Sequence, residues 1–312
     1  MMRSLYSAVG GLRNHQTRMD VIGNNIANVN TTGFKSGRAS FQDILTQNVQ
    51  GASAAQGNKG GVNPMQIGLG MTSSSIDNLF TNGSIQSTGV GTDLAISDAG
   101  FFMLSDGTTS TTTAQAEGSV GKVYTRDGNF DFDNTGVFVS RSSGMKVLGW
   151  GSVAAGGQVP ATAPVYASQL QELTVTIGGT YDTTLISATA GSATDTLNSV
   201  SFNKSGQIIG TFASGLNGVL GQVALGKFNN PGGMTKLGSN TYIPSANSGT
   251  ASIGAASTGG RGSITPGALE MSNVDLSQQF SDMIVTQRGF QSNSKIITVS
   301  DEMLETLVNM KR

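Results

Sequence analysis

Apolar residues near both ends of the chain recur at steps of three and four, whereas the middle of the chain carries short alternating runs. Near the N-terminus the spacing is carried by Leu5, Val9, Leu12, Met19, Ile22 and Ile26. Near the C-terminus it is carried by Leu276, Phe280, Met283, Phe290, Ile297, Leu304 and Val308. Such spacing is typical of a coiled-coil seam, so it predicts two terminal helices that pair with each other or with neighbouring copies.

The first helix is expected over residues 4–28, ending in the turn-forming residues 28–33. Gly10, Gly11 and Gly23 weaken it, each by about 1 kcal/mol relative to Ala. An isolated helix of this length and composition is marginal in water. We therefore expect it to become ordered only when it is packed against a partner.

The second helix is expected to begin after residues 272–275, which read as a capping box opened by Ser272, and to run nearly to Arg312. Polar residues occupy three heptad positions of its seam, Gln287, Ser294 and Asp301. This favours contact with several partners over a simple dimeric zipper. An ordinary amphipathic helix packed on its own β domain is the alternative.

Short apolar runs separated by Asp-Gly and Asn-Thr-Gly turns fill the middle of the chain and predict antiparallel hairpins. The expected fold class is α+β, with mainly β domains that are barrel-like or sandwich-like and terminal helices pairing as a coiled-coil domain. Residues Phe41, Ile44 and Leu45 favour one short helical turn within an otherwise extended connector. The expected domains are a helical assembly domain (1–30 plus 273–312), an extended connector (31–75), a β core (76–150 plus 216–272) and a small outer β domain (151–215).

Composition and charge exclude several classes of function. The net charge is -1 with no basic tract, which argues against nucleic acid, and the absence of Cys removes disulfides and thiolate chemistry. The only histidine, His15, lies beside the helical seam without a second ligand, so we read it as a helix-surface or interface residue. Residues 131–136 resemble the start of a calcium loop, but Ser142 stands where the loop needs Glu, so a hairpin turn is expected. We predict no enzyme activity, no cofactor, no metal and no small-molecule substrate.

The segment Asn24-Asn25-Ile26-Ala27-Asn28-Val29-Asn30-Thr31-Thr32-Gly33-Phe34-Lys35 resembles the N-terminal signature of the flagellar axial proteins, the rod and hook subunits. The motif positions are Asn24, Asn25, Asn28, Thr32, Gly33 and Phe34. Residues 267–276 and 283–288 are similar to the C-terminal signature of the same family. Further similar segments follow in the family's order at 63–70, 93–102, 124–130, 147–150 and 228–242, so the resemblance covers nearly the whole chain.

The resemblance implies a homopolymer, a helical tube of stacked copies with the terminal helices inside. Residues 304–312 and the insert at 151–215 favour a hook subunit, the flexible joint that transmits torque from rod to filament. Residues 3–7 also resemble the distal rod protein, which is the alternative within the family. The implied partners are the hook cap, the distal rod and the hook–filament junction proteins.

The implied location is extracellular, in the flagellar hook and basal body. The chain shows neither a secretory signal peptide nor an apolar run of about 18 residues, so we expect export by a dedicated machine without a cleaved signal. From another class of protein, a β-rich secreted adhesin or binding module is the alternative.

Overall fold

The computed structural model describes residues 2–54, 57, 60–105, 121–151, 170–183 and 194–310. They form mainly β structure with one helix near each end, as the expected α+β class requires. The chain divides into two units. We call Met1–Val29, Lys35–Leu79 and Val274–Arg312 the helical unit, and Asn30–Phe34 and Phe80–Asn273 the β unit.

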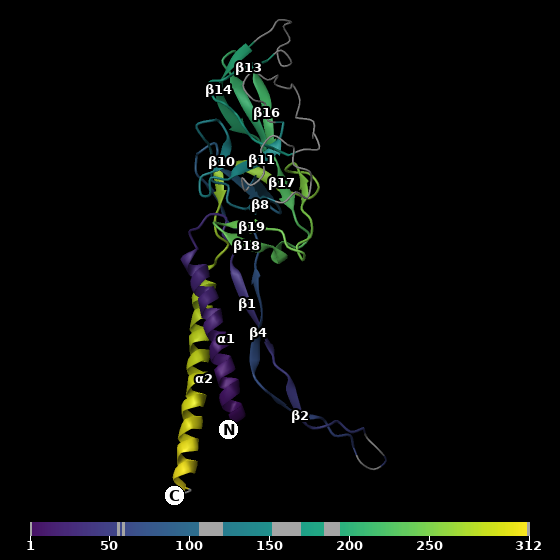
Figure 1. Cartoon of the computed structure of the whole chain (residues 1–312), viewed down its shortest axis with the longest axis vertical. Coiled ribbons are helices and arrows are strands. Elements are labelled where there is room, and N and C mark those ends of the chain that lie inside the picture. The colour runs from purple at the N-terminus through teal and green to yellow at the C-terminus, as the bar shows by residue number, and fades with distance from the viewer. Residues whose placement is uncertain are drawn as a thin grey trace. The chain divides into compact units, whose positions relative to one another are not determined.

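The helical unit contains both helices and two antiparallel pairs of strands (Figure 1). Its elements are α1 (Met2–Ala27), β1 (Gly37–Asp43), β2 (Thr46–Gln50), β3 (Met65–Gly68), β4 (Met71–Asn78) and α2 (Leu276–Met310). Asp275 caps α2, because its Oδ1 accepts hydrogen bonds from the backbone N–H groups of Ser277 (2.8 Å) and Gln278 (3.3 Å). The helix begins directly after residues 272–275, as expected.

The expected helical turn at Phe41, Ile44 and Leu45 is wrong. Phe41 lies in β1 opposite Ser73 of β4, and the N–H of Ile44 donates to the carbonyl of Gly70 (2.9 Å). The partner strand begins about 30 residues later in the chain, and a local apolar pattern carries no information about such pairing. The connector is extended as expected, but it is built from paired strands.

The β unit contains the remaining strands and one short 3₁₀ helix. Its elements are β5 (Ile85–Ser87), β6 (Leu94–Ser97), β7 (Phe101–Ser105), β8 (Lys122–Thr125), β9 (Phe130–Phe132), β10 (Phe138–Ser140), β11 (Lys146–Trp150), β12 (Gln171–Glu172), β13 (Thr180–Asp182), β14 (Thr194–Phe202), β15 (Gln207–Phe212), β16 (Asn217–Val223), β17 (Leu225–Lys227), η1 (Pro231–Gly233), β18 (Thr235–Gly238), β19 (Thr241–Ile243), β20 (Ser252–Gly254), β21 (Ser263–Pro266) and β22 (Ala268–Glu270).

The main sheet has the order β13-β14-β15-β16-β11-β7-β8-β19-β18, and all its pairings are antiparallel. Among the described residues its strands do not close into a barrel, so that form of the expected fold is not observed. Two smaller antiparallel pairs, β5 with β22 and β6 with β21, join distant parts of the chain. The predicted hairpin at residues 130–139 is confirmed as β9 and β10, with Phe132 opposite Phe138.

The core of the β unit lies on both faces of β7. Phe102 and Leu104 belong to one buried cluster, with Phe130 and Phe138, and Phe101 and Met103 belong to a second. Successive side chains of a strand point to opposite faces, so a strand covered on both faces has a continuous apolar sequence. This explains why residues 101–104 are apolar without alternation.

Parts of the expected outer domain at 151–215 lie outside the described residues. The described part contains β12 to β15, and Thr174 forms an isolated antiparallel bridge with Val137. The proposed domain boundaries themselves remain a prediction. No helix within the described residues combines the length and apolarity needed to cross a bilayer.

Candidate functional site

The two terminal helices contact each other in antiparallel orientation within the helical unit (Figure 1, purple and yellow). Nη2 of Arg18 donates to Oδ1 of Asp282 at 3.0 Å, and Nδ2 of Asn25 donates to Oε1 of Gln279 at 3.0 Å. Asn25 follows Arg18 in α1, whereas its partner Gln279 precedes Asp282 in α2, as expected for antiparallel helices. The partly exposed ion pair adds little free energy, but together the two contacts fix the register.

Small residues occupy the contact between the helices. A Cβ atom added to Gly11 would lie 2.5 Å from Nδ2 of Asn293, and one added to Gly289 would lie 2.7 Å from Cε1 of His15. The buried residues of α2 are Thr286 and Ser300. The helices therefore approach closely through small and polar positions. Sequence reasoning missed this face because it followed only apolar residues.

The predicted seam residues of α1 all lie on its covered side. Ile22 is buried, and Leu5, Val9, Leu12, Met19 and Ile26 are partly buried. The same helix also packs on the β1–β4 ribbon, where Nδ2 of Asn14 donates to the carbonyl of Met71 at 2.6 Å. Helix α1 is thus held between α2 and the ribbon.

The predicted seam residues of α2 divide into two groups. Met283, Ile297 and Leu304 are partly buried, on the same side as Thr286 and Ser300. The others are exposed: Leu276, Phe280 (50%), Phe290 and Val308 (67%). Further exposed apolar residues are Ile284, Val285, Ile296, Val299, Met303 and Leu307. At about 100° per residue these positions surround much of the helix, so a single chain leaves most of the apolar surface of α2 uncovered.

His15 is partly buried where α1 meets α2. Its ring fills the notch left by Gly289 and meets Phe41 of β1 edge-on, with ring centroids 6.5 Å apart. Nδ1 is buried, and no residue of the described chain hydrogen-bonds to it. Burial, and secondly the charge of Arg18, hold the pKa of His15 below its usual 6.5. Of the two places predicted for His15, on the surface of the helix or at an interface, this position fits the interface.

Asn25 joins three elements of the helical unit. Its side chain donates to the carbonyl of Gly37 (2.8 Å) and accepts from the N–H of the same residue (2.9 Å), besides donating to Gln279. The amide thus pairs with the backbone of β1 as a neighbouring strand would. The other two motif asparagines contact each other at the end of α1, where Nδ2 of Asn28 donates to the carbonyl of Asn24 at 2.9 Å.

The remaining motif residues belong to the β unit. The hydroxyl of Thr32 donates to Oδ1 of Asp127 at 3.0 Å, and the N–H of Gly33 donates to the carbonyl of Glu270 at 2.8 Å. Phe34 is buried, with Nζ of Lys236 4.3 Å from its ring centroid. A cation over an aromatic face is attractive, and burial lowers the pKa of Lys236. The motif therefore divides between the two units.

The described residues contain no group of three or more His, Cys, Asp or Glu side chains placed to hold a metal ion. The features brought together at the helices are packing contacts, small residues and exposed apolar side chains. Such an arrangement can bind other helices.

Known proteins with similar sequences match the whole chain. Residues 5–35 match the family described as flagella basal body rod protein, and residues 265–310 match the C-terminal family of the FlgEFG basal body rod proteins. The FlgG basal-body rod protein of Bacillus subtilis is 43% identical, with all of both chains covered. The FlgE hook protein of Borreliella burgdorferi is 32% identical, again over all of both chains. FlgE of Salmonella typhimurium is 28% identical over 99% of this chain.

These matches confirm the resemblance on which the sequence prediction relied, and they include both rod and hook proteins. The chain therefore belongs to the flagellar rod and hook protein family, whose members are structural components of the flagellum.

Proposed function

We propose that this chain is a structural subunit that self-assembles into the tubular flagellar hook, the flexible joint between rod and filament. The observation that carries the proposal is the apolar surface of α2. Its exposed side chains lie on several sides of a 35-residue helix, which is typical of a helix that is buried in an assembly. Neighbouring copies of the same helix are the simplest cover, because head-to-tail contacts that do not close produce helical filaments.

In this proposal the terminal helices form a coiled-coil assembly domain. Within one chain, α1 packs against α2 through the small residues of their contact face. Neighbouring copies pack against the exposed seam residues of α2, which are Leu276, Phe280, Phe290 and Val308. The glycine-weakened α1 gains order from both sets of contacts, so assembly and helix formation are coupled.

The β unit carries the surface of the tube, with the residues 151–215 as its outer part. Export without a cleaved signal and an extracellular position in the hook follow from the proposed role, as do contacts with the hook cap, the distal rod and the junction proteins. The proposed structural role requires no catalytic activity.

The distal rod is the second candidate, and one observation favours it. The alignment with the Bacillus subtilis rod protein spans 313 positions, close to the 312 residues of this chain, whereas the alignment with the Borreliella hook protein spans 456. Both candidates require a helical tube and differ in its stiffness.

Electron microscopy of the purified full-length protein, driven to assemble by concentration or salt, tests the proposal. Curved tubes are the expected result for a hook, and straight tubes would favour the rod. Amide exchange on the unassembled protein is the accompanying measurement. A chain that stays monomeric while both helices are strongly protected from exchange would contradict assembly and favour the adhesin reading.

A further inference from the structure

The chain passes between the helical unit and the β unit at four places, between residues 29 and 30, 34 and 35, 79 and 80, and 273 and 274. Inside the β unit these passages leave three crossing segments: residues 30–34, 80–84 and 270–273. Whatever the units do relative to each other, any force carried along the covalent chain passes through these segments.

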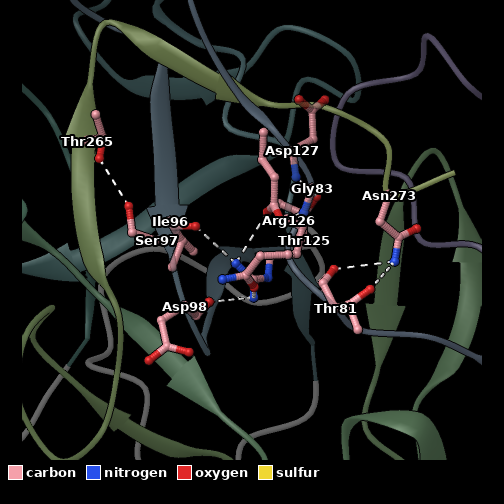
Figure 2. Close-up of polar contacts among 12 residues, drawn as sticks. Thr81, Gly83, Ile96, Ser97, Asp98, Thr125, Arg126, Asp127, Thr265 and Asn273 are labelled. Carbon is pink, nitrogen blue, oxygen red and sulfur yellow. Dashed lines mark hydrogen bonds and ion pairs between the residues drawn. The ribbon is translucent and has the colours of Figure 1, made fainter. Parts of the chain in front are cut away.

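One dipeptide, Arg126-Asp127, contacts all three crossing segments, although it lies directly after β8 in the middle of the chain. Asp127 accepts from the hydroxyl of Thr32 at 3.0 Å. Arg126 donates to Oε2 of Glu270 at 3.3 Å and to Oδ1 of Asn82 at 3.4 Å. Figure 2 shows the Arg126 side chain reaching Ile96 and Asp98, whose backbone carbonyls accept its hydrogen bonds at 3.3 and 2.6 Å.

Glu270 links the same three segments from the other side of the ion pair. Its Oε1 accepts from the N–H of Gly83 at 3.0 Å, and its backbone carbonyl accepts from the N–H of Gly33 at 2.8 Å. Next to it, the N–H of Met271 donates to the carbonyl of Ser84 at 2.9 Å, and the amide of Asn273 donates to the Thr81 hydroxyl at 2.9 Å (Figure 2). Residues 270–273 are thus bonded directly to both of the other crossing segments.

The charges at this junction are almost entirely removed from water. The exposed fractions of the Arg126 and Glu270 side chains are 2% and 1%. Arg126 lies 5.5 Å from the ring centroid of Phe101, and it donates to the carbonyl of Asp98 at 2.6 Å. Asp98 has φ 93, a conformation that side chains other than Gly rarely adopt, so this contact holds a strained backbone in place. Breaking a pair buried this deeply leaves an uncompensated charge.

We propose that Arg126, Asp127 and Glu270 form a crossing clamp, a positioning device that locks the three crossing segments to one another. The clamp keeps the points of exit from the β unit fixed when load passes along the chain. It goes beyond the assembly proposed above, because its contacts lie within one chain and exist in the unassembled protein. An ordinary core ion pair would stabilise the whole β unit and would have no special effect on the exits.

Amide hydrogen exchange of the full-length monomer, measured by mass spectrometry, distinguishes a crossing clamp from an ordinary core ion pair. In Arg126→Gln and Glu270→Gln we expect the amides of residues 30–34, 80–84 and 270–273 to exchange at least about tenfold faster. Strands β15 and β16 should keep their protection. Arg141→Gln is the matched control, because it removes an exposed ion pair with Asp131 in the same unit, and it should change none of the three segments.

Thr32→Val keeps the test decisive if the charge variants fail to fold. It removes one hydroxyl contact to Asp127 and leaves the buried ion pair intact. A clamp predicts faster exchange at Gly83 and Met271 as well as at Gly33, because the three segments are coupled through it. Faster exchange confined to residues 30–34, unchanged exchange at the exits, or an equal loss of protection in β15 and β16 of the charge variants would each overturn the proposal.

Discussion

Gly33 shows how a single residue of the signature motif is constrained by its neighbours. Its φ is 66, and a Cβ atom would lie 2.6 Å from the backbone nitrogen of Asp127. A side chain there meets both backbone strain and a rigid obstacle. We expect Gly33→Ala to lower the free energy of unfolding of the β unit by roughly 2–4 kcal/mol, measured by denaturant unfolding.

Gly144→Ala is the matched control for this prediction. Gly144 has φ 68 in the same unit, but nothing lies within 4 Å of its Cβ position. Only the conformational cost remains there, about 1–2 kcal/mol. Equal losses in the two variants would show that the contact with Asp127 contributes nothing and that backbone conformation alone selects glycine at position 33.

At the scale of elements, Gly289 lets the two helices approach. A Cβ atom at this position would meet the His15 ring at 2.7 Å, so Gly289→Val must displace His15 or separate α1 from α2. We expect the free energy of unfolding of the helical unit to fall by roughly 1–3 kcal/mol. The measurement is denaturant unfolding monitored by the circular dichroism signal of the helices. Gly23→Val is the control, since nothing lies within 4 Å of its Cβ position, and it should be neutral or slightly stabilising. Similar losses in both would contradict close packing at Gly289.

The same contact predicts that the pairing of α1 with α2 depends on pH. Because the pKa of His15 is held below 6.5, the unfolded chain binds the proton more readily than the folded chain. The stability contributed by neutral His15 is therefore complete above pH 6.5 and is lost as the pH falls below that value through the folded pKa. We expect the helix signal to melt at lower temperature at pH 5 than at pH 7.5.

His15→Phe is the variant that tests the cause of this pH dependence, because it keeps an aromatic ring in the notch and removes the titrating group. It should flatten the dependence between pH 7.5 and 5. Asp131, Asp133 and Asp195 also have shifted pKa values, but they belong to the β unit. Their pKa values are lowered from 3.8, so their effect on stability appears only below about that pH. An unchanged pH profile in His15→Phe would exclude His15 as the sensor.

The sequence was sufficient to predict both helices and the hairpin of β9 and β10, because their patterns are local. The helix ends lie within two residues of expectation at Met2, Ala27 and Met310. The division of α2 into a covered face and an exposed face could not be predicted. Steps of three and four mark apolar positions, but the covering helix selects small residues such as Thr286 and Gly289.

Long-range polar contacts were likewise beyond a local pattern. Arg126 and Glu270 are 144 positions apart, and Asn25 reaches Gln279 across 254 positions. The local sequence around a polar residue in a turn or helix does not indicate which distant residue it will hydrogen-bond. The signature motif marked Asn25 and Gly33, but only the structure supplied the reasons: one replaces a strand partner, and the other leaves room for Asp127.

At the scale of the whole molecule, the exposed apolar residues of α2 separate folding from assembly. Phe280, Ile284 and Val285 are 50%, 59% and 62% exposed, so replacing all three by Gln should change the unfolding free energy of the monomer by only about 1 kcal/mol. If neighbouring copies cover them, each side chain adds about 1 kcal/mol to assembly, since roughly half of its burial remains to be gained. The three together should raise the critical concentration for tube formation by about 100-fold, measured by sedimentation.

The control for that variant replaces three exposed polar residues of the same helix that lie outside the predicted seam, Gln291, Ser292 and Thr298, by Ala. It alters as many positions and favours helix formation, so a general effect on α2 would appear in it as well. Assembly should continue at the concentration that the unaltered chain requires. A critical concentration unchanged in the apolar variant would mean that this side of α2 remains in water within the tube, and the interface between copies would then have to lie on another face.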